Sequence, residues 1–91
     1  MLLQQLITFC TVVDEGGFTR AADVLSMSQP AVSKQVKTLE QKLQAELLVR
    51  TGRQVSLTPA GELVYSYAKR IIHTVEELHG VVHEHPAQVE D

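Results

Sequence analysis

The residues with the clearest capacity for chemistry are basic and polar side chains between positions 28 and 53. Lys34 and Lys37 are three residues apart, so they share one face of any helix that contains them, and Ser33 lies beside them. Cations gathered on one helical face attract phosphate, and serine and lysine can also hydrogen-bond to the edges of bases. Taken alone, lysines on an exposed helix face are usually only solvated charges. Together with the helical motif around them, these residues predict contact with a nucleic acid.

The charge of the chain is distributed unevenly. The formal net charge is -3, which by itself disfavours a polyanionic partner. Residues 18–58, however, hold six basic and three acidic side chains, a local charge of +3, whereas the rest of the chain holds two basic and eight acidic side chains, a charge of -6. The basic segment is thus the part that we expect to face a nucleic acid.

Helices must position these side chains. Apolar residues recur at intervals of three and four over residues 3–14, 18–25 and 29–43, which predicts three helices. Glycines 16 and 17 end the first helix, and Ser28 can cap the third, whose first turn holds Pro30. The break between the second and third helices has the length of a turn, so the pattern is that of a helix-turn-helix. The outward face of the third helix is basic and polar, because its apolar residues fall on the opposite side.

A hairpin and a long helix follow. Residues 47–50 and 55–57 predict two short strands around the turn 51–53, and Thr58 followed by Pro59 predicts the start of a helix that Pro86 ends. Apolar residues alternate spacings of four and three along this helix, the pattern of a seam against a second long helix. The predicted seam consists of Val64, Ala68, Ile71, Val75, Leu78 and Val82.

The expected fold class is mainly α. Residues 1–58 are expected to form a winged helix-turn-helix of three helices and a short two-stranded wing, residues 59–85 a long linker or dimerisation helix, and residues 86–91 a hinge or a cut end. Ninety-one residues suffice for one small core. No stretch approaches the roughly 20 apolar residues that span a bilayer, and the start lacks the basic region of a secretory signal, so we expect a cytoplasmic protein without a membrane partner.

Two segments resemble a known family, the LysR-type transcriptional regulators. The segment GGFTRAADVLSMSQPAVSKQVKTLEQKL resembles the helix-turn-helix signature of that family, and LLVRTGRQVSLTPAG resembles its wing and the start of its linker helix. The similarity extends from residue 3 to about residue 80. Three positions depart from the family pattern: Gln44 replaces a usual glycine, Leu48 a usual phenylalanine and Gly17 a usual serine.

The resemblance implies sequence-specific binding of double-stranded DNA, with the third helix in the major groove and the wing at the minor groove. It also implies a homodimer on an interrupted palindromic operator, a tetramer in the full-length protein, and a small-molecule effector that binds only through a C-terminal domain missing from this chain. The residues expected to contact DNA are Thr19, Arg20, Gln29, Pro30, Ala31, Ser33, Lys34, Lys37, Arg50 and Arg53.

Other interpretations of the basic residues remain open. Arg50 could instead pair with Glu46, and Arg20 could pair with Asp23 three residues further along. The competing function is a winged-helix module that binds protein or only dimerises, and it would be favoured by loss of the basic face. A molybdate-responsive regulator shares the winged architecture, but the segments quoted above argue against it.

No residue pattern indicates catalysis. The carboxylates are scattered, no glycine-rich phosphate loop precedes a helix, and Cys10 lies among apolar residues where we expect it to be buried. His79 and His83 are four residues apart and follow Glu76, a spacing that could hold a metal, but a solvated helix face is the commoner origin of such a pattern. We therefore expect neither an enzyme, nor a metal, nor a cofactor.

Overall fold

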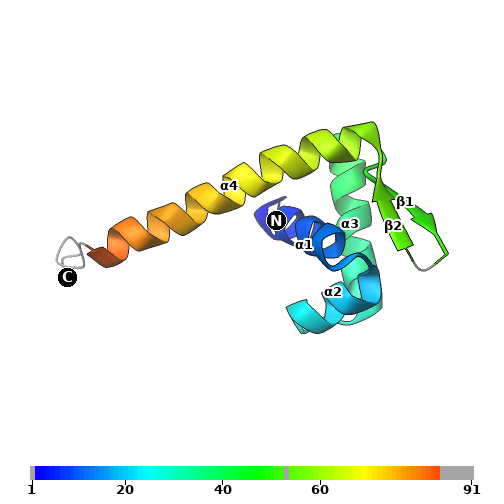
Figure 1. Cartoon of the computed structure of the whole chain (residues 1–91), viewed down its shortest axis with the longest axis horizontal. Coiled ribbons are helices and arrows are strands. Elements are labelled where there is room, and N and C mark those ends of the chain that lie inside the picture. The colour runs from blue at the N-terminus through cyan, green and yellow to red at the C-terminus, as the bar shows by residue number, and fades with distance from the viewer. Residues whose placement is uncertain (1, 53, 85–91) are drawn as a thin grey trace.

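A computed structural model describes residues 2–52 and 54–84 of the chain. The first three helices cluster together, the hairpin lies at one side of the cluster, and the last helix extends away from it (Figure 1). The elements in chain order are α1 (Leu2–Glu15), α2 (Phe18–Leu25), α3 (Gln29–Leu43), β1 (Leu48–Thr51), β2 (Gln54–Leu57) and α4 (Pro59–Glu84). The predicted fold class, a winged helix-turn-helix followed by a long helix, is confirmed.

The helix ends follow local chemistry. Gly16 has a φ of 80°, a left-handed conformation that glycine adopts without strain, and its N–H donates to the carbonyls of Val12 and Val13. Ser28 caps α3, because its hydroxyl accepts a hydrogen bond from the N–H of Ala31 at 3.2 Å. Thr58 caps α4 in the same way, with the N–H of Gly61 2.9 Å from its hydroxyl oxygen. Both caps are those that the sequence predicts.

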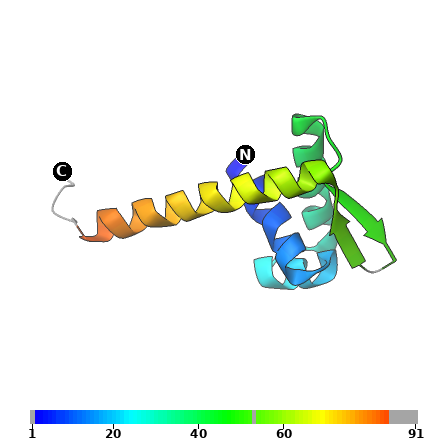
Figure 2. The ribbon, with the colours of Figure 1, turned by 45° about the horizontal axis from the view of Figure 1, so that its top comes forward.

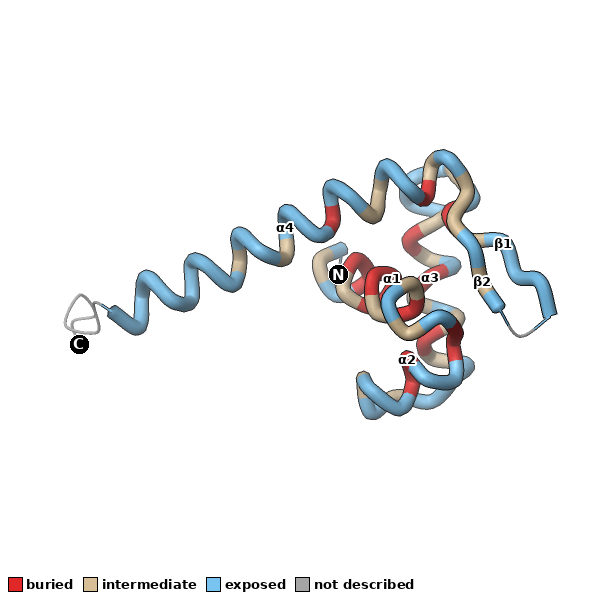
Figure 3. The backbone as a smooth tube through the Cα atoms, in the orientation of Figure 1, coloured by how far each residue is buried: buried red, intermediate tan, exposed pale blue. Residues whose placement is uncertain are grey.

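Two buried clusters hold α3 in place. One joins α1, α3 and the start of α4 around Phe9, Leu39 and Leu47, and the other joins α1, α2 and α3 around Val12 and Val32. Buried positions are concentrated on α1, α2 and α3, whereas the distal half of α4 is mostly exposed (Figure 3). Because its inner side is packed in both clusters, α3 presents its outer side in a fixed orientation.

The entry to the wing differs from the prediction. We predicted that the first strand begins at Leu47, but β1 begins at Leu48 and pairs antiparallel with β2, with Leu48 opposite Leu57. Leu47 is fully buried, its N–H donates to the Glu40 carboxylate at 2.8 Å, and its carbonyl accepts the N–H of Thr58 at 3.1 Å. Its backbone groups are thus satisfied by α3 and by the cap of α4 rather than by a strand partner.

The first half of α4 packs against α1. Ala68 is buried in this contact. In addition, the hydroxyl of Tyr65 and the ammonium of Lys69 each lie 2.5 Å from a carboxylate oxygen of Asp14 at the end of α1. Burial alone would raise the pKa of Asp14, but the hydrogen bonds from Lys69 and Tyr65 and the charge of Lys69 outweigh it, so that this pKa lies below its ordinary value of 3.8. The hydrogen bond between Lys69 and Asp14 also raises the pKa of Lys69.

The second half of α4 leaves the core. The last residue of α4 that packs against the buried clusters is Ile72, and the helix continues for three more turns in isolation, as Figures 1 and 2 show from two directions. None of the described helices has both the length and the apolar character that a bilayer-spanning segment needs.

Candidate nucleic-acid interface

The outer face of α3 is polar and cationic. Lys34, Lys37 and Gln41 are exposed on this face, and Val32 and Val36 are buried on the opposite one. The pattern arises because the apolar residues recur at helical spacing and direct one side of α3 into the two clusters. The side chains that the sequence singled out therefore project outward from a helix whose position is fixed.

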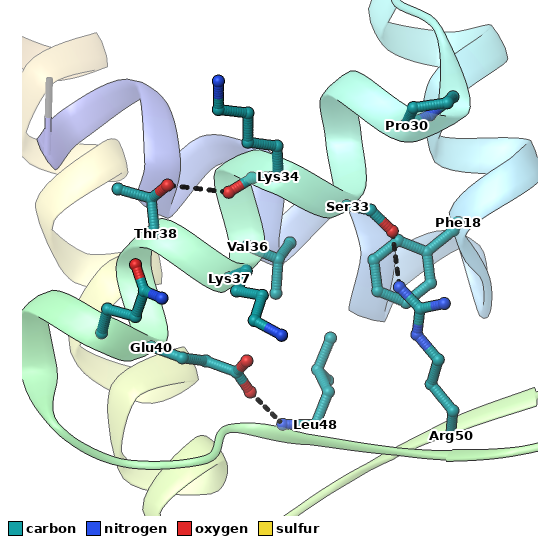
Figure 4. Close-up of a pocket in the computed structure, with 11 residues that line it drawn as sticks. Phe18, Pro30, Ser33, Lys34, Val36, Lys37, Thr38, Glu40, Leu48 and Arg50 are labelled. Carbon is teal, nitrogen blue, oxygen red and sulfur yellow. Dashed lines mark hydrogen bonds between the residues drawn. The ribbon is translucent and has the colours of Figure 1, made fainter.

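An open groove of about 710 Å³ separates this face from the wing. Lys34, Lys37 and Thr38 line it from α3, and Leu48 and Arg50 line it from β1 (Figure 4). The groove brings together residues that are up to 32 positions apart in the sequence, from Phe18 to Arg50. Its cationic and hydroxyl groups suit a partner that carries negative charge and hydrogen-bond acceptors.

Arg50 connects the wing to the helical cluster. One of its terminal nitrogens, Nη2, lies 2.5 Å from the hydroxyl oxygen of Ser33 on α3. The carbon of its guanidinium lies 3.8 Å from the centre of the Phe18 ring, and that ring is itself only 8% exposed. The alternative pairing with Glu46 is therefore wrong: Arg50 binds an aromatic face and a hydroxyl instead (Figure 4).

A second hollow lies on the other side of Arg50. Thr19 and Arg20 at the start of α2, Gln29 at the start of α3 and Gln54 on β2 line it. Arg20 has a side chain that is 78% exposed, and its nearest carboxylate is that of Glu15 at 4.0 Å, not that of Asp23. A contact of this kind on the surface contributes little to stability and leaves the guanidinium available.

The first turn of α3 completes the set of predicted residues. Gln29 and Pro30 are exposed, whereas Ala31 is partly exposed and its N–H is occupied by the Ser28 cap. Arg53, the other predicted residue of the wing, lies outside the described residues. The structure therefore gathers Ser33, Lys34, Lys37 and Arg50 around one groove, and Thr19, Arg20 and Gln29 around the neighbouring hollow.

Three contributors to the site were missed by reasoning from the sequence. Phe18 supports Arg50, Gln54 lines the second hollow, and the Glu40 carboxylate accepts the N–H groups of Leu47 and Leu48 at 2.8 and 3.3 Å. Glu40 thereby directs the chain from α3 into the wing. The spacing of seven and eight residues between these partners carries no periodic signal, so only the tertiary structure reveals the contact.

The predicted seam of α4 needs a correction. Ala68 has no exposed surface and Val64 packs against the core of its own chain, so the prediction that Ala68 contributes to a surface between copies is wrong. Their side of the helix faces α1. A stripe of exposed apolar residues runs along α4 next to the side that faces α1; it begins at Leu63 and Tyr67, which immediately precede Val64 and Ala68. The exposed stripe consists of Leu63, Tyr67, Ile71, Leu78 and Val82 together with the partly exposed Val75.

The cysteine and the possible metal ligands are the alternative candidate sites. Burial raises the pKa of the Cys10 thiol to about 11, so the thiol stays protonated and unreactive at neutral pH. Over residues 2–52 and 54–84, no three side chains of histidine, cysteine, aspartate or glutamate are grouped so that they could hold a metal ion.

Comparison of the sequence with known families gives one match over most of the chain. Residues 3–62 match the family described as "Bacterial regulatory helix-turn-helix protein, lysR family". The nitrogen assimilation regulatory protein nac of Escherichia coli (strain K12) is 43% identical over 83 residues, which cover 91% of this chain and 27% of that protein. The chain thus spans about a quarter of the length of the curated relatives that it matches.

Solved structures resemble the whole described fold. The BenM DBD in its complex with benA site 1 DNA has a TM-score of 0.86 and 38% identity, over 92% of this chain and 98% of that chain. BenM is an HTH-type transcriptional regulator of Acinetobacter baylyi. The CbnR DBD in its complex with DNA has a TM-score of 0.85 and 32% identity, over 92% and 97% of the two chains.

Proposed function

The chain belongs to the LysR family of bacterial regulatory helix-turn-helix proteins, and from this premise we propose that it is the DNA-binding part of a transcription regulator. The observation that carries the proposal is the cationic outer face of α3 beside the wing, in a fold that resembles chains solved as DNA complexes. The proposed partner is double-stranded DNA, bound with a preference for sequence. This role needs no catalysis, and the named relatives are regulators rather than enzymes.

The dimensions of α3 suit the major groove. An α-helix with its side chains is about 10–12 Å wide, and the major groove of B-DNA is about 12 Å wide. The first turn of α3 would approach base edges with Gln29, Pro30 and Ala31, and Ser33 and Lys34 would follow along the groove. Lys37, further from the helix start, would bind phosphate.

The wing and α2 would bind DNA on either side of the major groove that α3 occupies. Arg53 at the wing turn is proposed for the minor groove, and Thr19 and Arg20 at the start of α2 for phosphate. These contacts carry no sequence information of their own, but they fix the register of α3 on the duplex.

A dimer is part of the proposal. The exposed stripe of α4 continues over about five turns and ends beyond the core, so a second copy of α4 would cover apolar side chains that the protomer leaves in water. A two-fold dimer would present two α3 helices to two half-sites about one helical turn apart, that is, to an interrupted palindrome. For the full-length protein we propose a cytoplasmic tetramer whose further domain binds a small-molecule effector.

Three lysine variants of α3 test the DNA contact. Lys37→Ala should weaken binding to all duplexes about equally and reduce the slope of log affinity against log salt by about 0.9 for each phosphate that the variant no longer neutralises. Lys34→Ala should weaken binding and also change the preference among sequences. Lys42→Ala is the matched control, because Lys42 is exposed on the same helix but does not line the groove.

The titrations separate the two candidate functions. Equal losses of affinity for Lys42→Ala and Lys37→Ala would contradict the assignment of the groove. Absence of binding to any duplex at low salt would favour the winged-helix module that binds protein.

A further inference from the structure

We propose that Arg50 is a positioning residue that sets the hydrogen-bonding direction of Ser33, so that Ser33 donates to DNA. The proposal rests on the proposed function, because it concerns how α3 meets bases. It assigns to Arg50 an action through a neighbouring side chain rather than a direct phosphate contact. Its basis is the contact between Arg50, Phe18 and Ser33 described above.

The supports of Arg50 are rigid on both sides. On β1 it lies opposite Val55, and Val55 packs against the cluster of α1, α2 and α3. The Phe18 ring belongs to the same cluster and is almost fully buried. A planar guanidinium 3.8 Å from the centre of a fixed ring is held by stacking and by its attraction to the ring face. The nitrogen that reaches Ser33 is therefore placed by the core and by the strand register.

The chemistry of this pair determines which group donates. A guanidinium carries only donors, so the Ser33 oxygen must be the acceptor of the 2.5 Å hydrogen bond. A hydroxyl has one proton of its own in addition to its lone pairs. When the Ser33 hydroxyl accepts a hydrogen bond from the Arg50 cation, its O–H bond is polarised. The hydroxyl then becomes a stronger hydrogen-bond donor and a weaker acceptor.

The proton of Ser33 differs from those of three threonines on the helices. Thr11, Thr38 and Thr74 each donate to the carbonyl four residues earlier, at 2.8 to 2.9 Å. This is the usual local partner of a helical hydroxyl. Within the part of the chain that the structure describes, Ser33 makes no such bond. Its proton is available to a group outside the protein, and Ser33 is partly exposed at the groove.

The direction of this hydrogen bond has consequences for base reading. In the major groove, guanine presents only acceptors, O6 and N7, whereas cytosine presents the N4 amino donor. A hydroxyl held as a donor should favour an acceptor edge and disfavour the cytosine amino group. Without Arg50, the same hydroxyl could rotate and serve either kind of edge. Arg50 would thus contribute to sequence preference without touching a base.

The experiment begins with duplexes that the wild-type chain selects from a random pool. The best duplex is the probe, and each of its base pairs is replaced in turn to give a profile of discrimination for wild type, Arg50→Lys, Ser33→Ala and the double variant. Lysine keeps the charge but loses the planar stack. We expect both single variants to lose about tenfold in discrimination, equivalent to about 1.4 kcal/mol, at one and the same base pair. The double variant should lose no more than either single variant.

The matched control is Arg70→Lys. Arg70 also lies over an aromatic ring, that of Tyr67 at 5.3 Å, but it is on α4 away from the groove. This variant should leave the profile unchanged. Melting curves of all variants verify that they fold.

Three other results would overturn the inference. A phosphate contact of Arg50 would make Arg50→Lys change affinity equally at every base pair. Effects of Arg50→Lys and Ser33→Ala that add, or that fall on different base pairs, would show that the two residues act independently. A wild-type chain that selects no sequence would contradict the proposed function itself and the inference with it, whereas either of the first two results leaves the proposed function standing.

Discussion

Gly61 provides a quantitative test of how α4 is joined to the helical cluster. A Cβ atom added at this position would lie 2.0 Å from the carbonyl oxygen of Leu47 and 3.1 Å from the side chain of Leu57. The oxygen cannot move easily, because it accepts the N–H of Thr58 while the N–H of Leu47 is held by Glu40. Gly61→Ala must therefore push α4 away from the entry to the wing.

Three contributions determine how much Gly61→Ala changes the free energy of unfolding. Overpacking of this kind costs about 1–3 kcal/mol, and loss of the hydrogen bond between Thr58 and Leu47 costs about 1 kcal/mol more. The helix propensity of alanine offsets this by about 1 kcal/mol. The net loss in the free energy of unfolding is about 1–3 kcal/mol, or a fall in Tm of roughly 5–20 °C for a domain of this size.

Gly80→Ala is the matched control. Gly80 is also inside α4, but within the described chain nothing lies within 4 Å of the position where a Cβ would be added. Alanine there should stabilise the protein by about 0.5–1 kcal/mol, because only the helix propensity changes. Thermal unfolding followed by helical circular dichroism, at one protein concentration, measures both variants. Equal stabilisation by the two substitutions would refute the packing of α4 against Leu47.

Three further predictions concern the end of α3, the contact between α1 and α4, and the exposed stripe. Gln44 has a φ of 55°, so Gln44→Gly should raise the free energy of unfolding by about 0.5–1 kcal/mol, and an unchanged melting curve would contradict strain there. Asp14→Asn should cost less than about 1 kcal/mol at neutral pH, since Asp14 is 39% exposed. Because its folded-state pKa is lowered, this difference should be complete above pH 3.8, and it should shrink as pH falls through the folded-state pKa. Denaturant unfolding at a series of pH values measures the difference, and a difference that stays constant over the whole series would oppose the assignment. Leu78→Glu should give monomers in analytical ultracentrifugation, whereas Ser66→Glu on the other side of α4 should not, and a dimer mass that persists in Leu78→Glu would exclude pairing through the stripe.

The elements were predictable from the sequence where their signals are local. Ser28 and Thr58 are caps whose partners lie three residues away, and the first two helices are separated by glycines that tolerate the geometry of a helix end. The basic face of α3 was predictable for the same reason, because helical periodicity assigns each side chain to a face.

The failures concern contacts between distant residues. Ala68 fits the spacing of a seam, yet α1 covers it, and periodicity cannot distinguish a stripe that packs within the chain from one that packs against a second copy. Arg50 looked like a surface cation because nothing in the sequence shows that Phe18 and Ser33 lie beneath it. Gln44 adopts the left-handed conformation for which the family usually has glycine, so the fold imposes that geometry against the local preference of the residue.

The most direct test of the central claim is a binding titration of the intact chain by fluorescence anisotropy. A pool of interrupted palindromes is compared with a scrambled duplex at two salt concentrations. DNA binding through the basic face predicts tighter binding to the palindromes, and an affinity that falls by about a thousandfold or more between roughly 50 and 200 mM salt. Equal binding of both DNAs, or no binding to any duplex at the lower salt concentration, would contradict it.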